Sequence, residues 1–253
     1  MISPELRESF LHRYGGGTGS AQLAKGYRFA ESLVSNAERQ RHFFVPPTVR
    51  TTNVVFTSVC RSALAAPLLD PREVKLYLDR VYREVFPEIY SRDGEIDKLI
   101  GDSVIAVFGP PFVGEGQLAC TEGLRAAVEF ARRVIQKLAY TDIEVKCAIR
   151  QGPLCFTMVG SEQYHEPSVV GNTLAELHRL SSVSHARAMN LFAETAEHRF
   201  VEGLPTRTPA THEARWQCGT HVVGDLKGVD FKRIYVQEWL DPAIAYRPAW
   251  ATR

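Results

Sequence analysis

Apolar residues recur along the chain in two rhythms, one at every second residue and one at every third or fourth. The first rhythm, with many β-branched residues, predicts strands, and the second predicts helices. The order expected for the central part is β-α-β-β-α-β, with strands at 54–60, 95–100, 103–108 and 143–151 and helices at 71–86 and 118–139, and a further strand is expected at 154–159. This is the ferredoxin-like split βαβ order, in which helices cover one face of an antiparallel sheet. We therefore predict an α+β fold.

The first of these helices has a well-defined start. Asp70 is expected to be the N-cap, Pro71 the first helical residue and Glu73 the partner in a capping box. Apolar residues then form a stripe as far as Phe86, and Pro87 is expected to end or kink the helix. Another strand pair is expected near the C-terminus, over residues 222–229 and 232–236.

A β-hairpin follows this helix, because Gly101-Asp102 separates the two runs Glu95–Ile100 and Ser103–Phe108. Strict alternation along the first run places Lys98 in an apolar row and Asp97 on the opposite face. The residues alone leave two interpretations open. Lys98 and Asp102 are either a solvated edge lysine and an ordinary turn aspartate, or parts of a functional site.

Composition excludes several functional classes. The 253 residues carry 30 Lys and Arg against 29 Asp and Glu, so no field of one sign favours nucleic acid or an anionic membrane surface. No run of about 18 apolar residues predicts a membrane span, and we expect a cytoplasmic protein. The five cysteines are scattered, and neither they nor the histidines, His178 among them, show the spacing of a metal site.

The domain organisation is expected to be simple. Residues 1–51 are interpreted as a helical extension with a glycine-rich linker, in which a helix over about 21–44 stops before Pro46-Pro47. Residues 52–240 form the main domain, and residues 241–253 are a tail.

Three segments resemble a known family. Lys98-Leu99-Ile100-Gly101-Asp102 resembles the Lys-Phe-Ile-Gly-Asp hairpin of the class III nucleotidyl cyclases, the adenylate and guanylate cyclases. Residues 169–180 resemble the family's Val-Ile-Gly-Asp/Asn-Thr-Val-Asn-Leu-Ala-Ala-Arg-Leu segment, and residues 222–236 are similar to its Leu-Lys-Gly and Val-Tyr ending. The resemblance covers about residues 52–239.

The resemblance implies a reaction and a set of partners. In this family a ribose 3′-oxygen attacks the α-phosphorus of a nucleoside triphosphate, and two aspartates hold two Mg²⁺ or Mn²⁺ ions. The sites form in a head-to-tail dimer, in which one partner supplies the metal ligands and the other supplies the base-selecting and phosphate-binding residues.

Three positions match the family's functional residues. By resemblance, Asp102 is the second metal ligand, Lys98 is the base-selecting lysine and Arg179 is the phosphate-binding arginine. From spacing alone, Arg179 could instead be a surface partner of Glu176, one turn away on the same helix. Asn172 is accepted by the family at its position, and could also be the N-cap of that helix.

Three positions depart from the family. Ser58 stands where the family has its first metal-binding aspartate, and Ala175 replaces the asparagine that orients the ribose. Ser168 stands where adenylate cyclases often have an aspartate or threonine that helps to select the base, although it could be a plain loop serine. The losses at Ser58 and Ala175 together are expected to cost about 10⁴–10⁶ in rate.

Two functions are therefore carried forward. The first is a catalytically weak or inactive pseudo-cyclase, a regulatory module that forms a homodimer or pairs with another cyclase domain and can bind a nucleoside triphosphate. The alternative is an active cyclase that converts ATP or GTP to a 3′,5′-cyclic nucleotide and pyrophosphate, with Asp97 or another nearby carboxylate in place of the missing one. Alternation argues against Asp97 in that role, because it predicts opposite faces for Asp97 and Lys98.

Overall fold

The structure is a computed structural model that describes residues 44–60, 70–141, 143–161, 163, 165–206, 214–242 and 244. It divides into a larger compact unit, made of residues 50–154 and the chain from residue 170 onward, and a smaller one that includes residues 155–169. The predicted N-terminal helix, apart from Phe44, and most of the predicted tail lie outside the described residues. The predicted boundaries at residues 52 and 240 stay predictions.

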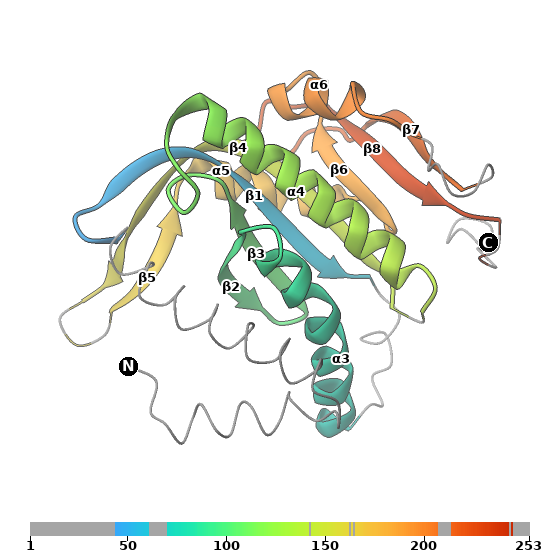
Figure 1. The fold of residues 1–253 in the computed structure, drawn as a ribbon, viewed down its shortest axis with the longest axis horizontal. Coiled ribbons are helices and arrows are strands. Elements are labelled where there is room, and N and C mark those ends of the chain that lie inside the picture. The colour runs from blue at the N-terminus through green and yellow to red at the C-terminus, as the bar shows by residue number, and fades with distance from the viewer. Residues whose placement is uncertain are drawn as a thin grey trace. The chain divides into compact units, whose positions relative to one another are not determined.

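One mixed sheet organises the chain (Figure 1). Its main path has the order β2-β3-β1-β4-β6-β8-β7, and β5 pairs with β4 outside this path. The first four strands of the path are in ferredoxin-like order, which confirms the predicted α+β fold. The strands are β1 (Thr48–Val59), β2 (Glu95–Ile100), β3 (Ser103–Phe108), β4 (Val145–Gly160), β5 (His165–Val170), β6 (Ala188–Phe192), β7 (Arg215–Val222) and β8 (Arg233–Leu240).

Strand β4 corrects one prediction from the sequence. Gly152-Pro153 was expected to separate two strands, but β4 is continuous through both residues. A residue before proline favours extended backbone, so the dipeptide is compatible with a strand. Gly152 is needed for packing, because a Cβ atom there would lie 2.4 Å from the hydroxyl oxygen of Thr173. The same hydroxyl donates to the carbonyl of Pro153 at 2.9 Å.

Two long helices, α3 (Pro71–Tyr90) and α4 (Gly116–Leu138), share one hydrophobic core with the sheet. The predicted capping box of α3 is confirmed, since Asp70 accepts from the Arg72 amide at 2.8 Å and its own amide donates to Glu73 at 3.1 Å. Pro87 does not end α3, which continues to Tyr90. A proline so close to the end of a helix removes only one hydrogen bond. No described helix is long and apolar enough to span a membrane.

Helix α5 (Asn172–Val183) contacts the opposite face of the sheet, whereas Val201 of the short helix α6 (Ala196–Glu202) joins the same core as α3 and α4. Alternation along β1 places Val55 in that core and Phe56 on the other face. The Phe56 ring meets the His178 imidazole of α5 edge to face, with the centroids 5.1 Å apart. Helix α5 therefore lies over the face that carries Phe56.

Candidate functional site

The β2–β3 hairpin forms as predicted, with Gly101 and Asp102 in its turn. Gly101 has a φ of 60°, in the left-handed region that favours glycine. Helix α3 anchors the turn, because the Tyr82 hydroxyl donates to the Gly101 carbonyl at 2.6 Å. The Asp102 carboxylate accepts from the Ser103 hydroxyl at 3.2 Å.

A β-bulge at Asp97 corrects the predicted faces of β2. Ile96 pairs with Ala106 and Lys98 pairs with Ile105, so two residues of β2 advance the register by only one residue of β3. Lys98 therefore faces away from Ile96, on the side of the sheet that α5 contacts. The Asp97 carboxylate lies 3.7 Å from the Lys98 ammonium, and its side chain is 2% exposed. The prediction of opposite faces for Asp97 and Lys98 is thus wrong.

Ser58 and Asp102 lie on neighbouring strands, as the resemblance implies. Ser58 of β1 pairs directly with Ser103 of β3, the residue after Asp102. Ser58 is 9% exposed, and its hydroxyl donates to the Val59 carbonyl at 3.3 Å. Burial raises the pKa of the nearby Cys60 thiol to about 11, where the cation of Lys146 opposes the effect and the carboxylates of Glu144 and Asp102 add to it.

These residues do not fit a site for two divalent cations. Mg²⁺ and Mn²⁺ prefer carboxylate oxygens, and the pair Ser58 and Asp102 offers one carboxylate. Within the part of the chain that the structure describes, no group of three or more His, Cys, Asp or Glu side chains could hold a metal ion. The pair Ser58 and Asp102 therefore carries one negative charge fewer than the two aspartates that the resemblance implies.

Lys98 of β2 and Arg179 of α5 both lie close enough to the His178 imidazole to act on its pKa, on the face of the sheet that α5 contacts. Burial is the main cause of the lowered pKa of the His178 imidazole, and the Arg179 and Lys98 cations lower it further. Arg179 and Ala175 are exposed on α5. His178 was expected to be a structural or surface residue, and no spacing in the sequence marks its contact with Phe56, which comes from packing between α5 and β1.

Ser168 and Asn172 have different surroundings. Ser168 lies in β5, in the smaller unit, and is 2% exposed. Its predicted contact with a base stays a prediction. Asn172 is the first residue of α5, whereas Gly171 holds the N-cap position, and the Asn172 amide donates to the Glu176 carboxylate at 3.0 Å.

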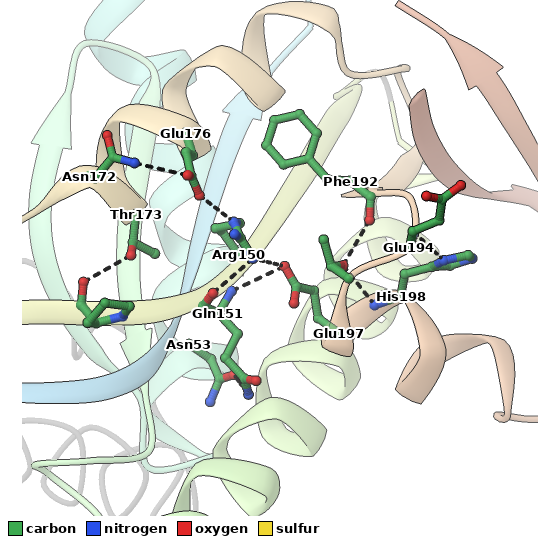
Figure 2. Close-up of polar contacts among 12 residues, drawn as sticks. Asn53, Arg150, Gln151, Asn172, Thr173, Glu176, Phe192, Glu194, Glu197 and His198 are labelled. Carbon is green, nitrogen blue, oxygen red and sulfur yellow. Dashed lines mark hydrogen bonds and ion pairs between the residues drawn. The ribbon is translucent and has the colours of Figure 1, made fainter. Parts of the chain in front are cut away.

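A network of charged side chains joins β4, α5 and α6, and it was not predicted from the sequence (Figure 2). Arg150 of β4 donates from Nε to Glu176 of α5 and from Nη1 to Glu197 of α6, both at 2.6 Å. The Glu197 side chain is 1% exposed and that of Arg150 is 15% exposed. The only hint in the sequence is an arginine at the end of the apolar run that starts at Val145.

Comparisons with known sequences give distant relatives, and no protein-family model matches the chain. An uncharacterized protein of Mycobacterium bovis is 25% identical over 207 residues, which are 81% of this chain and 35% of that protein. An uncharacterized protein of Mycobacterium tuberculosis is 28% identical over 200 residues, which are 78% of this chain and 35% of that protein. The chain thus spans about a third of the length of the curated relatives that it matches.

Solved structures give a clearer result. The catalytic core of a rhodopsin-guanylyl cyclase with converted specificity, in complex with ATPαS, matches with a TM-score of 0.62 and 16% identity over 78% of this chain and 100% of that one. The adenylyl cyclase CyaB from P. aeruginosa matches with a TM-score of 0.58 and 16% identity over 77% and 96%. The non-canonical dimeric guanylyl cyclase domain of the RhoGC fusion protein from the aquatic fungus Blastocladiella emersonii matches with a TM-score of 0.56 and 15% identity over 77% of this chain and 98% of that one. The chain therefore has the fold of the class III adenylate and guanylate cyclase catalytic domains.

Proposed function

We propose that this chain is a nucleotide-binding regulatory module with the cyclase fold and with little or no cyclase activity. The observation that carries the proposal is the asymmetry of the site. Lys98 and Arg179 are both retained, and both act on the His178 imidazole, whereas the paired strands β1 and β3 present Ser58 beside Asp102 where the resemblance implies two carboxylates. Binding groups are thus kept and a catalytic group is lost.

The retained side chains would act on different parts of a nucleoside triphosphate. The exposed Arg179 guanidinium can donate to phosphate oxygens in a bidentate way. Lys98, fixed beside the buried Asp97 carboxylate, can donate to a base edge. Ala175 has no polar group to orient the ribose. With one carboxylate in the metal half, no catalytic step is assigned to a metal ion.

The module is proposed to act as a head-to-tail dimer, either with a second copy or with another cyclase domain. The support is the division of the site residues into two sets; a matching guanylyl cyclase domain is also dimeric, although its dimer is non-canonical. Ser58 and Asp102 form one set, and Lys98, Ala175 and Arg179 form the other. In a heterodimer, a partner with both aspartates would face Lys98 and Arg179 of this chain, and Ala175 would still leave that site without its asparagine.

The test combines a binding assay with a turnover assay. Calorimetric titration of the purified protein with ATP and GTP should show binding that Arg179→Gln weakens, and mass spectrometry should detect no cyclic product above that of an Asp102→Ala control with Mg²⁺ or Mn²⁺. Restoring Ser58→Asp and Ala175→Asn together should raise turnover at least about 10²-fold. Product from the unmodified chain well above the control would instead establish an active cyclase, and absence of binding would overturn the proposal.

A further inference from the structure

Glu176 and Arg179 are three residues apart on α5, a spacing at which opposite charges usually pair on a helix surface. In the structure they do not pair. The two Glu176 carboxylate oxygens accept from other donors, Oε2 from Arg150 Nε at 2.6 Å and Oε1 from the Asn172 amide at 3.0 Å (Figure 2). Arg179 is exposed, and its guanidinium has no ion pair with any residue that the structure describes.

Arg150 is itself held firmly from several sides. Its Nη1 atom donates to Glu197 at 2.6 Å and to the Gln151 carbonyl at 2.9 Å. Its guanidinium lies over the Phe231 ring, 5.0 Å from the ring centroid. The planar guanidinium can serve two carboxylates at once, which a lysine at this position could not do with the same geometry. Glu176 is thus drawn toward the sheet by a partner that cannot easily move.

We propose that Arg150 is a positioning residue that holds Glu176 away from Arg179 and so keeps the Arg179 guanidinium open to the phosphates of a nucleoside triphosphate. The role in nucleotide binding rests on the proposed function. If Arg150 is removed, Glu176 keeps the hydrogen bond from the neutral Asn172 amide but loses its cation, and Arg179 becomes the nearest cation on the same helix. The carboxylate then competes with phosphate oxygens for the same guanidinium.

The variants must separate this effect from a loss of folding. Arg150→Gln alone leaves the buried Glu197 carboxylate without its cation, which destabilises the protein. The test variant is therefore Arg150→Gln with Glu197→Gln, which removes both charges and leaves the Glu176 carboxylate with the neutral Asn172 amide but without its cation. A second variant adds Glu176→Gln. The matched control is Arg187→Gln, which removes a different arginine–glutamate contact, from Arg187 to Glu144 at 2.9 Å.

The first measurement needs no nucleotide. Phenylglyoxal modifies accessible arginines, and mass spectrometry of the peptide with Arg179 gives its rate of modification. We expect the rate to fall in the Arg150→Gln, Glu197→Gln variant, to return to that of the unmodified chain when Glu176→Gln is added, and to stay unchanged in Arg187→Gln. An unchanged rate in the first variant, or a lowered rate that Glu176→Gln does not restore, would overturn the positioning role.

The second measurement is calorimetric binding of ATP and of inorganic triphosphate. The Arg150→Gln, Glu197→Gln variant should bind both ligands about two- to fivefold more weakly at low salt. This loss of affinity should become smaller at high salt, and adding Glu176→Gln should restore the affinity. If the modification rates change as expected while the unmodified chain binds neither ligand, the proposed function fails and the positioning of Glu176 stands. If the chain binds both ligands and the variants do not differ, the inference fails alone.

Discussion

At the residue scale, Ser58 is the position on which the proposed loss of cyclase activity chiefly depends. Its hydroxyl occupies a buried position on β1 directly opposite Ser103, the neighbour of Asp102. A serine hydroxyl can ligate a hard cation, but it brings no charge to compensate for the cost of removing water from that cation. We do not expect Asp97 to supply the missing charge, because its buried carboxylate lies beside the Lys98 ammonium.

The roles of the two aspartates can be separated in the restored variant that carries Ser58→Asp and Ala175→Asn. Adding Asp102→Asn should lower its turnover at least about 10²-fold, because a carboxylate of the metal half is lost again. Adding Asp97→Asn should lower turnover less than this and should act mainly on KM, through Lys98. Initial rates of cyclic nucleotide formation measure both effects. Equal losses of kcat in the two variants would assign Asp97 to the metal half.

At the element scale, local patterns predicted the secondary structure well where the signal is itself local. The turn of the β2–β3 hairpin and the start of α3 follow from turn and capping chemistry, and both are confirmed. The bulge at Asp97 was missed, because it depends on how β2 pairs with β3 and leaves no mark in the alternation of β2. The contact from Arg150 to Glu176 joins residues 26 positions apart and needs the packed sheet and α5.

The packing of α4 against the sheet gives a prediction for this element. A Cβ atom on Gly123 would lie 2.6 Å from the Cα atom of Gly109 and 2.7 Å from the Phe108 carbonyl oxygen, so α4 reaches the end of β3 only because residue 123 is glycine. Gly123→Ala should lower the free energy of unfolding by at least about 1–3 kcal/mol, because backbone rather than a flexible side chain must move.

Urea denaturation followed by circular dichroism measures this effect, and Gly203→Ala is the control. A Cβ atom on Gly203 would come no closer than 3.5 Å to its nearest neighbour, and the φ of this residue is −75°, which alanine adopts readily. The control should therefore stay within about 0.5 kcal/mol of the unmodified chain. Similar losses in both variants would mean that the approach of α4 to β3 is looser than the structure indicates.

At the scale of the whole molecule, the fold was predictable because the order of strands and helices restricts the sheet to few topologies. The site was predictable only in part. Its residues could be named by resemblance, but their charge balance depends on groups that come from separate elements. His178 on α5 lies near Lys98 on β2, and His185 lies beside His221 on β7, with the two ring centroids 4.6 Å apart. Neither of these two neighbouring pairs could be predicted from the sequence, because each joins residues that are far apart along the chain.

His178 and His185 are expected to make the stability of the fold depend on pH. Burial, with the Arg179 and Lys98 cations, lowers the pKa of His178, and burial, with the His221 imidazole, lowers that of His185 against the opposing effect of Glu238. Because both pKa values lie below the ordinary 6.5 in the folded state, the unfolded chain binds more protons than the folded chain once the pH falls toward and below 6.5. The contribution of each neutral imidazole is thus fully present above that pH and is lost as the solution is acidified.

We therefore expect the free energy of unfolding, measured by urea denaturation between pH 8 and pH 5, to decrease on the acidic side of about pH 6.5. The variant His178→Gln, His185→Gln should show a smaller decrease over the same range, because glutamine does not titrate. Each single variant should remove part of the difference, and the parts should add, since the two imidazoles have separate charged neighbours. An identical slope in the double variant would assign the pH dependence to other groups, and a steeper slope would mean that the imidazoles stabilise the fold in their charged form.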